Sequence, residues 1–145
     1  MFRNILVTTD GSEFSERAFT HAVELAKMSN AKLTAVTVTT PIQYVAFEGV
    51  IYPEDPARYK QITDAQAEAA LDEVANVARA AGVACERVHA ESPYPYEGII
   101  DTAKANVCDL IVMASHGRRG ISAMLLGSET QKVLTHSPIP VLVYR

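Results

Sequence analysis

Three glycines, two arginines and several hydroxyl residues gather in residues 113–131, which read MASHGRRGISAMLLGSETQ. The stretch continues from the apolar run DLIVMAS, which is typical of a buried strand. Main-chain amides can hold a phosphate only where no Cβ obstructs its approach. Gly117 and Gly120 provide that freedom after the strand, and Gly127 lets the chain come close a second time. The spacing therefore predicts an anion-binding loop.

A helix is predicted to begin at Ser128, because Ser128-Glu129-Thr130-Gln131 has the spacing of a capping box. A helix N-terminus has unbonded N–H groups and about half a positive charge, both of which favour phosphate. The Ser128 hydroxyl either donates to an anion or caps the helix. The two common glycine-rich phosphate-binding motifs are missing from the sequence. There is no G-x-x-x-x-G-K-[ST] run, and no G-x-G-x-x-G follows the first strand.

Alternating strands and helices must position this loop. Apolar and β-branched runs predict strands over 4–10, 32–40, 83–92, 108–115 and 139–145. Apolar residues at helical spacing predict helices over 12–30, from about 60 to a stop at Gly82, and over 96–107 and 127–137. This alternation predicts a mostly parallel sheet with helices on both faces. Residues 41–59 have no clean helical or strand period. We expect them to form a long surface loop that folds over a ligand or, alternatively, an irregular segment that only packs against the domain.

Two strand ends are the most polar of the set, namely Thr8–Gly11 and Met113–Gly117. Ligands of open parallel sheets bind beyond the carboxyl ends of the strands, where the strand order reverses. If the chain winds outward from the first strand and then returns to its other side, these two ends become neighbours. Asp10 then contacts a ligand or, alternatively, forms a turn or helix cap. His116 contacts the ligand or only stabilises its own loop.

Composition excludes several classes of protein. A chain of 145 residues suits one domain, and a net charge of −4 argues against nucleic acid or an anionic membrane as a partner. No apolar run approaches the ~18 residues of a membrane span, and no targeting segment is visible. Two cysteines, Cys85 and Cys108, predict reduced, unbridged thiols and a cytoplasmic location. The four histidines show no metal-ligand spacing.

The spacing Ala114-x-x-Gly117, nine residues, Gly127-Ser128 resembles the nucleotide-binding signature of the universal stress protein family, which is G-x-x-G, nine residues, G-[ST]. Ala114 stands where the signature has its first glycine. The resemblance extends to residues 5–26 and 137–145 and implies one Rossmann-like α/β domain over residues 1–145. It implies an open, twisted sheet of five parallel strands in the order 3-2-1-4-5, and homodimers paired through the last strand.

The resemblance also implies a ligand, which is ATP or else ADP or AMP, with Mg²⁺. Asp10 would face the ribose and phosphates or the ion, Val38 would lie against the adenine, and the segment around Gly127 would hold phosphates. The residues expected to bind the nucleotide are Thr9, Asp10, Val38, Met113, Ala114, His116, Gly117, Arg118, Gly127, Ser128, Glu129 and Thr130.

Efficient catalysis is not indicated, because no second clear carboxylate stands at a strand end beside Asp10 to activate water. We therefore expect a nucleotide-binding regulatory protein of the stress response with at most slow ATP hydrolysis. The alternative is a dimeric interaction module whose glycine loop is structural and empty. The apolar run PVLVYR at the chain end predicts a sheet edge that pairs with a second copy.

Overall fold

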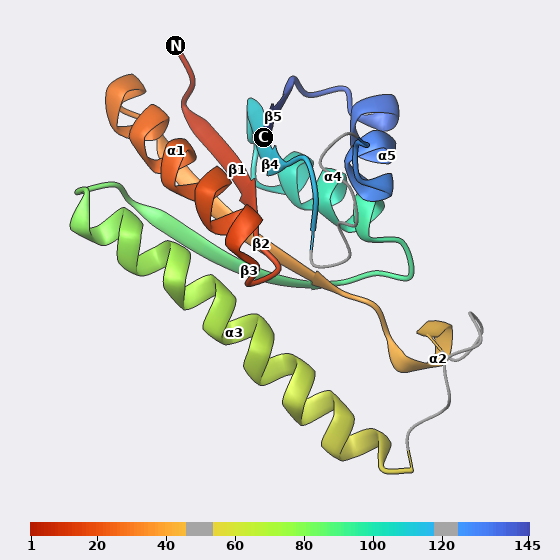
Figure 1. The fold of residues 1–145 in the computed structure, drawn as a ribbon. Coiled ribbons are helices and arrows are strands. Elements are labelled where there is room, and N and C mark those ends of the chain that lie inside the picture. The colour runs from red at the N-terminus through yellow and green to blue at the C-terminus, as the bar shows by residue number, and fades with distance from the viewer. Residues whose placement is uncertain (46–53, 118–124) are drawn as a thin grey trace.

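The computed structural model describes residues 1–45, 54–117 and 125–145. A parallel sheet forms the middle layer, and helices cover both of its faces (Figure 1). The strands lie in the order β3-β2-β1-β4-β5, which confirms the order implied by the family resemblance. Their bounds are β1 (Asn4–Thr8), β2 (Lys32–Thr39), β3 (Cys85–Glu91), β4 (Leu110–Ala114) and β5 (Val141–Tyr144).

The helices divide between the two faces because successive side chains of each strand point to opposite sides. Ile5 and Val7 of β1 face a core built with α1 (Glu13–Ser29) and α3 (Pro56–Ala80). Leu6 faces the second core, built with α4 (Pro95–Ala105) and α5 (Ser128–His136). Since β1 and β4 are covered on both faces, both are almost wholly buried. This explains their continuous apolar sequences.

β1 pairs directly with β4, with Ile5 opposite Leu110 and Val7 opposite Val112. The chain runs outward from β1 through β2 to β3 and then returns to the other side of β1 through β4. The strand order therefore reverses between β1 and β4. This confirms the predicted neighbourhood and places the topological switch point at their carboxyl ends.

Local signals set most helix ends as predicted. The Ser12 hydroxyl caps α1 by accepting from the Ser15 amide at 3.3 Å, and Asn30 ends this helix at a left-handed φ of 52°. The predicted loop over 41–59 is wrong at both ends. Residues 42–45 form the short helix α2 (Ile42–Val45), and α3 already begins at Pro56 behind the cap Asp55. Residues 46–53 lie outside the described part of the chain.

The two cysteines are free, as predicted. Cys85 opens β3, whereas Cys108 is buried in the turn before β4 rather than on the strand. Within the described ranges, no helix has the length and apolar character that crossing a membrane requires.

Candidate functional site

The carboxyl ends of β1 and β4 bring two predicted residues together. A Cβ built on Gly117 would lie 2.9 Å from Oδ2 of Asp10, so these residues touch across the switch point. Thr9, Met113 and Ala114 are buried beside them. Arg118, like Arg119 and Gly120, lies outside the described residues.

On the β1 side of this point, the turn satisfies its own amides. The Gly11 amide donates to the Thr9 hydroxyl at 3.2 Å, and the Ser12 amide donates to Oδ1 of Asp10 at 2.9 Å. The Ser15 amide is taken by the Ser12 cap. Asp10 therefore forms the turn at this strand end, and the contact with a ligand stays a prediction. Its other carboxylate oxygen lies against Gly117.

On the β4 side, Gly127 lies in close contact with the strand end. Its amide donates to the Ser115 carbonyl at 2.7 Å, and a Cβ at this position would meet the same oxygen at 2.9 Å. This close approach leaves no room for a Cβ, so the position requires glycine. The Gly127 amide is already bonded, so any phosphate contact from this segment has to come from the amides that follow it.

α5 begins directly after Gly127, which is its N-cap residue and makes no side-chain cap. Ser128 is thus the first helical residue, as predicted, whereas the alternative that its hydroxyl caps the helix is wrong. The first helical hydrogen bond runs from the Gln131 amide to the Gly127 carbonyl at 3.0 Å. The amides of Ser128, Glu129 and Thr130 precede this bond, and none of them has an acceptor among the described residues.

The side chains of this first turn are engaged elsewhere. The Thr130 hydroxyl donates to the Ala114 carbonyl at 3.0 Å, which fixes α5 at the end of β4. The Gln131 side chain donates to the Leu126 carbonyl at 2.9 Å. Neither side chain accepts a hydrogen bond from the three amides. The turn therefore presents three N–H groups and the positive end of the helix beside the switch point.

Glu129 contacts another helix, which the sequence analysis did not foresee. Its Oε2 accepts from the Tyr96 amide at 2.9 Å, and its Oε1 lies 3.1 Å from Nζ of Lys132. Tyr96 lies in the first turn of α4, whose own N-cap residue Tyr94 makes no side-chain cap. Glu129 thus caps α4 rather than α5. The helix begins at Pro95, and the residue directly before it, Tyr94, is not one of the usual capping residues Ser, Thr, Asp or Asn. This pattern indicates that the cap of α4 comes from another part of the chain.

Val38 lies near the end of β2, half-buried on the face that α4 covers. A Cβ on Gly98 of α4 would meet Cγ1 of Val38 at only 2.8 Å, so helix and strand are in tight contact at this point. The first turns of α4 therefore hold Val38, which is the residue predicted to lie against the adenine.

His116 is bound to its own loop. Its Nδ1 lies 2.9 Å from the Ser115 hydroxyl oxygen, and its ring centroid is 6.1 Å from that of Phe14. Nε2 is buried and has no hydrogen-bond partner among the described residues. Among all the residues that the structure describes, no group of three or more His, Cys, Asp or Glu residues is arranged to hold a metal ion. A Mg²⁺ contact through Asp10 stays a prediction.

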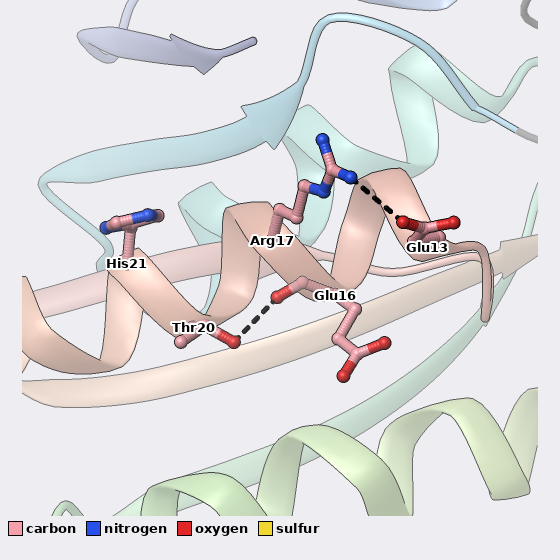
Figure 2. A pocket seen from close by; sticks show the side chains of 5 residues that line it. All are labelled: Glu13, Glu16, Arg17, Thr20 and His21. Atoms are coloured by element: carbon pink, nitrogen blue, oxygen red, sulfur yellow. Dashed lines mark hydrogen bonds and ion pairs between the residues drawn. The ribbon is translucent and has the colours of Figure 1, made fainter.

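A shallow hollow lies on the outer surface of α1 and is separate from the switch point (Figure 2). Its lining side chains are Glu13, Glu16, Arg17, Thr20 and His21. Arg17 is paired with Glu13 at 2.9 Å, and the Thr20 hydroxyl donates to the helix carbonyl of Glu16. All five come from one helix, and none belongs to the predicted site.

The reversal of strand order and the open first turn of α5 define a doubly wound α/β protein with an open helix N-terminus at its switch point. The sequence model of the universal stress protein family matches residues 1–145, and the chain belongs to this family. A putative universal stress protein of Staphylococcus aureus is 33% identical over 146 residues, covering 99% of this chain and 84% of the relative.

Solved structures show the same fold. The hypothetical protein MJ0577 superposes with a TM-score of 0.82 at 25% identity, covering 99% of this chain and 95% of the other. A universal stress protein solved in complex with cAMP has a TM-score of 0.70 at 28% identity and coverages of 99% and 97%. A universal stress protein of Archaeoglobus fulgidus, solved with dAMP, shares the fold at 21% identity, a TM-score of 0.72 and coverages of 99% and 98%. Two of these neighbours were thus solved with an adenine nucleotide.

Proposed function

We propose that this chain binds an adenine nucleotide, ATP or else ADP or AMP, with Mg²⁺ at the switch point between β1 and β4. The phosphates contact the amides of Ser128, Glu129 and Thr130, and the adenine lies against Val38. The observation that carries the proposal is the first turn of α5, whose three amides have no acceptor among the described residues while the side chains of Glu129 and Thr130 bond elsewhere.

Physical chemistry supports an anion as the ligand. Hydrogen bonds to a charged group contribute about 1.5–3 kcal/mol each, and the positive helix end adds to them. The net charge of −4 gives no general attraction for anions, so a locally placed group has to capture the phosphate. The adenine preference is supported by the neighbour solved with cAMP.

The role we propose is that of a cytoplasmic regulatory protein of the stress response, whose conformation or partner choice depends on nucleotide occupancy. Fast hydrolysis would require a base that activates water. Asp10 is engaged in its turn, and the Glu129 carboxylate is held by Tyr96 and Lys132. We therefore expect at most slow ATP hydrolysis. We expect neither nucleic acid nor membrane as a partner.

Two measurements test the proposal, namely the release of nucleotide that co-purifies with the chain and the binding of added nucleotide. The purified chain is heat-denatured, and its supernatant is analysed by anion-exchange chromatography. Isothermal titration calorimetry then compares ATP with Mg²⁺ against adenosine. We expect adenine nucleotide in the supernatant, and ATP binding at least about tenfold tighter than adenosine binding, or about 1.4 kcal/mol. The absence of nucleotide from the supernatant, together with no heat on adding ATP, would contradict the proposal and favour the empty interaction module.

We further propose a homodimer paired through β5. β5 is a sheet edge of sequence VLVY, and Leu142 is 41% exposed on it. The opposite edge, β3, has charged side chains, among which Arg87 is paired with Asp72 of α3. Charges protect an edge strand from pairing, whereas an apolar edge favours it. Sedimentation equilibrium showing only monomer at high concentration would contradict this assembly.

A further inference from the structure

Glu129 links two parts of the site that lie on different helices. Its main-chain amide belongs to the open turn of α5, while its carboxylate accepts from the Tyr96 amide in the first turn of α4. Lys132 holds the second carboxylate oxygen at 3.1 Å. With both oxygens engaged, the side chain is fixed between the two helices and is kept away from the amides of its own turn.

The first turn of α4 depends on this contact. Proline at its first position, Pro95, has no amide to satisfy, and the amides of Glu97 and Gly98 donate to the Tyr94 carbonyl at 3.0 and 3.2 Å. The Tyr96 amide is the remaining donor of the turn, and Glu129 supplies its acceptor. Removing that acceptor leaves an unpaired amide at a half-buried position and loosens the start of α4.

The same turn of α4 also positions the base-facing residue. A Cβ on Gly98 would lie 2.8 Å from Cγ1 of Val38 and 3.2 Å from Cβ of Ser92, so α4 is packed against the end of β2 with no spare room. A shift of α4 therefore moves Val38, the residue that is proposed to lie against the adenine. Contact thus runs from the first turn of α5 through Glu129 and α4 to Val38.

We propose that Glu129 is a positioning residue that sets base selectivity: by holding the first turn of α4, it fixes Val38 against the adenine. Because this role is defined at the proposed nucleotide site, it rests on the proposed function. Glu129 contacts the phosphates only through its amide, so its side chain acts on the base end and not on the phosphate end.

Affinities of ATP and GTP, each with Mg²⁺, test the proposal in the full chain. We expect wild type to prefer ATP. Glu129→Ala lowers the ATP-to-GTP preference about tenfold, or about 1.4 kcal/mol. Glu129→Gln largely keeps it, because the amide oxygen still accepts from Tyr96. The matched control is Glu86→Ala, which also removes a glutamate paired with a lysine, Lys32 at 3.3 Å, but at the opposite end of the sheet. This control leaves the preference unchanged.

Gly98→Ala is a second variant that acts from the other side of α4. Alanine favours a helix interior by about 1 kcal/mol over glycine, so the helix is retained while the new methyl displaces Val38. We expect the same loss of preference. Amide hydrogen exchange without nucleotide gives an independent readout, since Glu129→Ala accelerates exchange at Tyr96.

The outcomes separate the two proposals. An unchanged ATP-to-GTP preference in Glu129→Ala, an equal loss in Glu129→Gln, or unaltered exchange at Tyr96 would overturn the role of Glu129 while leaving nucleotide binding intact. Wild-type protein that binds neither nucleotide would overturn the proposed function, and the base selectivity with it.

Discussion

Replacing Gly127 with alanine places a methyl carbon 2.9 Å from the Ser115 carbonyl oxygen. Ordinary van der Waals contacts begin at 3.4 Å, so the two groups have to separate by half an ångström. The backbone at Gly127 has φ −58° and ψ 146°, which alanine adopts without strain, and the cost comes from this contact alone. Such overpacking costs about 1–3 kcal/mol and stretches the 2.7 Å hydrogen bond from the Gly127 amide.

The start of α5 moves with Gly127, because Ser128 is the next residue and the first of the helix. A shift of about half an ångström takes a 2.9 Å amide–phosphate bond to the limit of good geometry. We expect ATP affinity to fall about 10- to 100-fold, or about 1.4–2.7 kcal/mol. Calorimetry with ATP and Mg²⁺ measures this loss, and urea unfolding measures the accompanying change in stability.

Gly82→Ala is the matched control. Gly82 ends α3 at a φ of +75° with open space around it, so alanine there costs about 1–2 kcal/mol of strain at a position far from the switch point. Both variants lose stability, but only Gly127→Ala is expected to lose affinity. Wild-type affinity in Gly127→Ala would refute the reasoning that the start of α5 holds the phosphates.

Further predictions concern stability, thiol chemistry and assembly. Val107 is 82% exposed at a left-handed φ of 54°, so Val107→Asn raises the free energy of unfolding in urea by about 1 kcal/mol. Burial raises the pKa of the Cys85 thiol above its ordinary value of 9.0, so alkylation at pH 7.5 is slower than for a free thiol. The folded chain then binds this proton more tightly than the unfolded chain, and stability falls as the pH rises above 9.0. Leu142→Lys puts a charge on the β5 edge, and sedimentation of this variant shows monomer where wild type shows dimer.

The sequence predicted the fold well because its strongest signals are local. The continuous apolar run of β4 indicated a buried strand, and the alternation of strands with amphipathic helices indicated a parallel sheet. The polar ends of these two strands then located the switch point, where Asp10 meets Gly117. The start of α3 at Pro56 falls inside the loop predicted over 41–59, although proline suits the first turn of a helix.

The details of the site depend on contacts between distant segments, which periodicity does not contain. Ser128 matched a capping box and does begin the helix, but Gly127, which approaches Ser115, takes the N-cap position. Glu129 was expected to bind the nucleotide, but its carboxylate contacts α4. Its bond to Tyr96 arises from the packing of α4 on α5, which is not apparent from either segment alone.

Amide chemical shifts provide the most direct measurement of where the phosphates bind. Labelled protein is titrated with ATP and Mg²⁺, and separately with adenosine, and the ¹H–¹⁵N signals of Ser128, Glu129 and Thr130 are followed. We expect these three amide protons to move downfield with ATP and to move little with adenosine, because only the phosphates accept their hydrogen bonds. Binding of ATP that leaves these three signals in place would contradict the assignment of the phosphates to the first turn of α5.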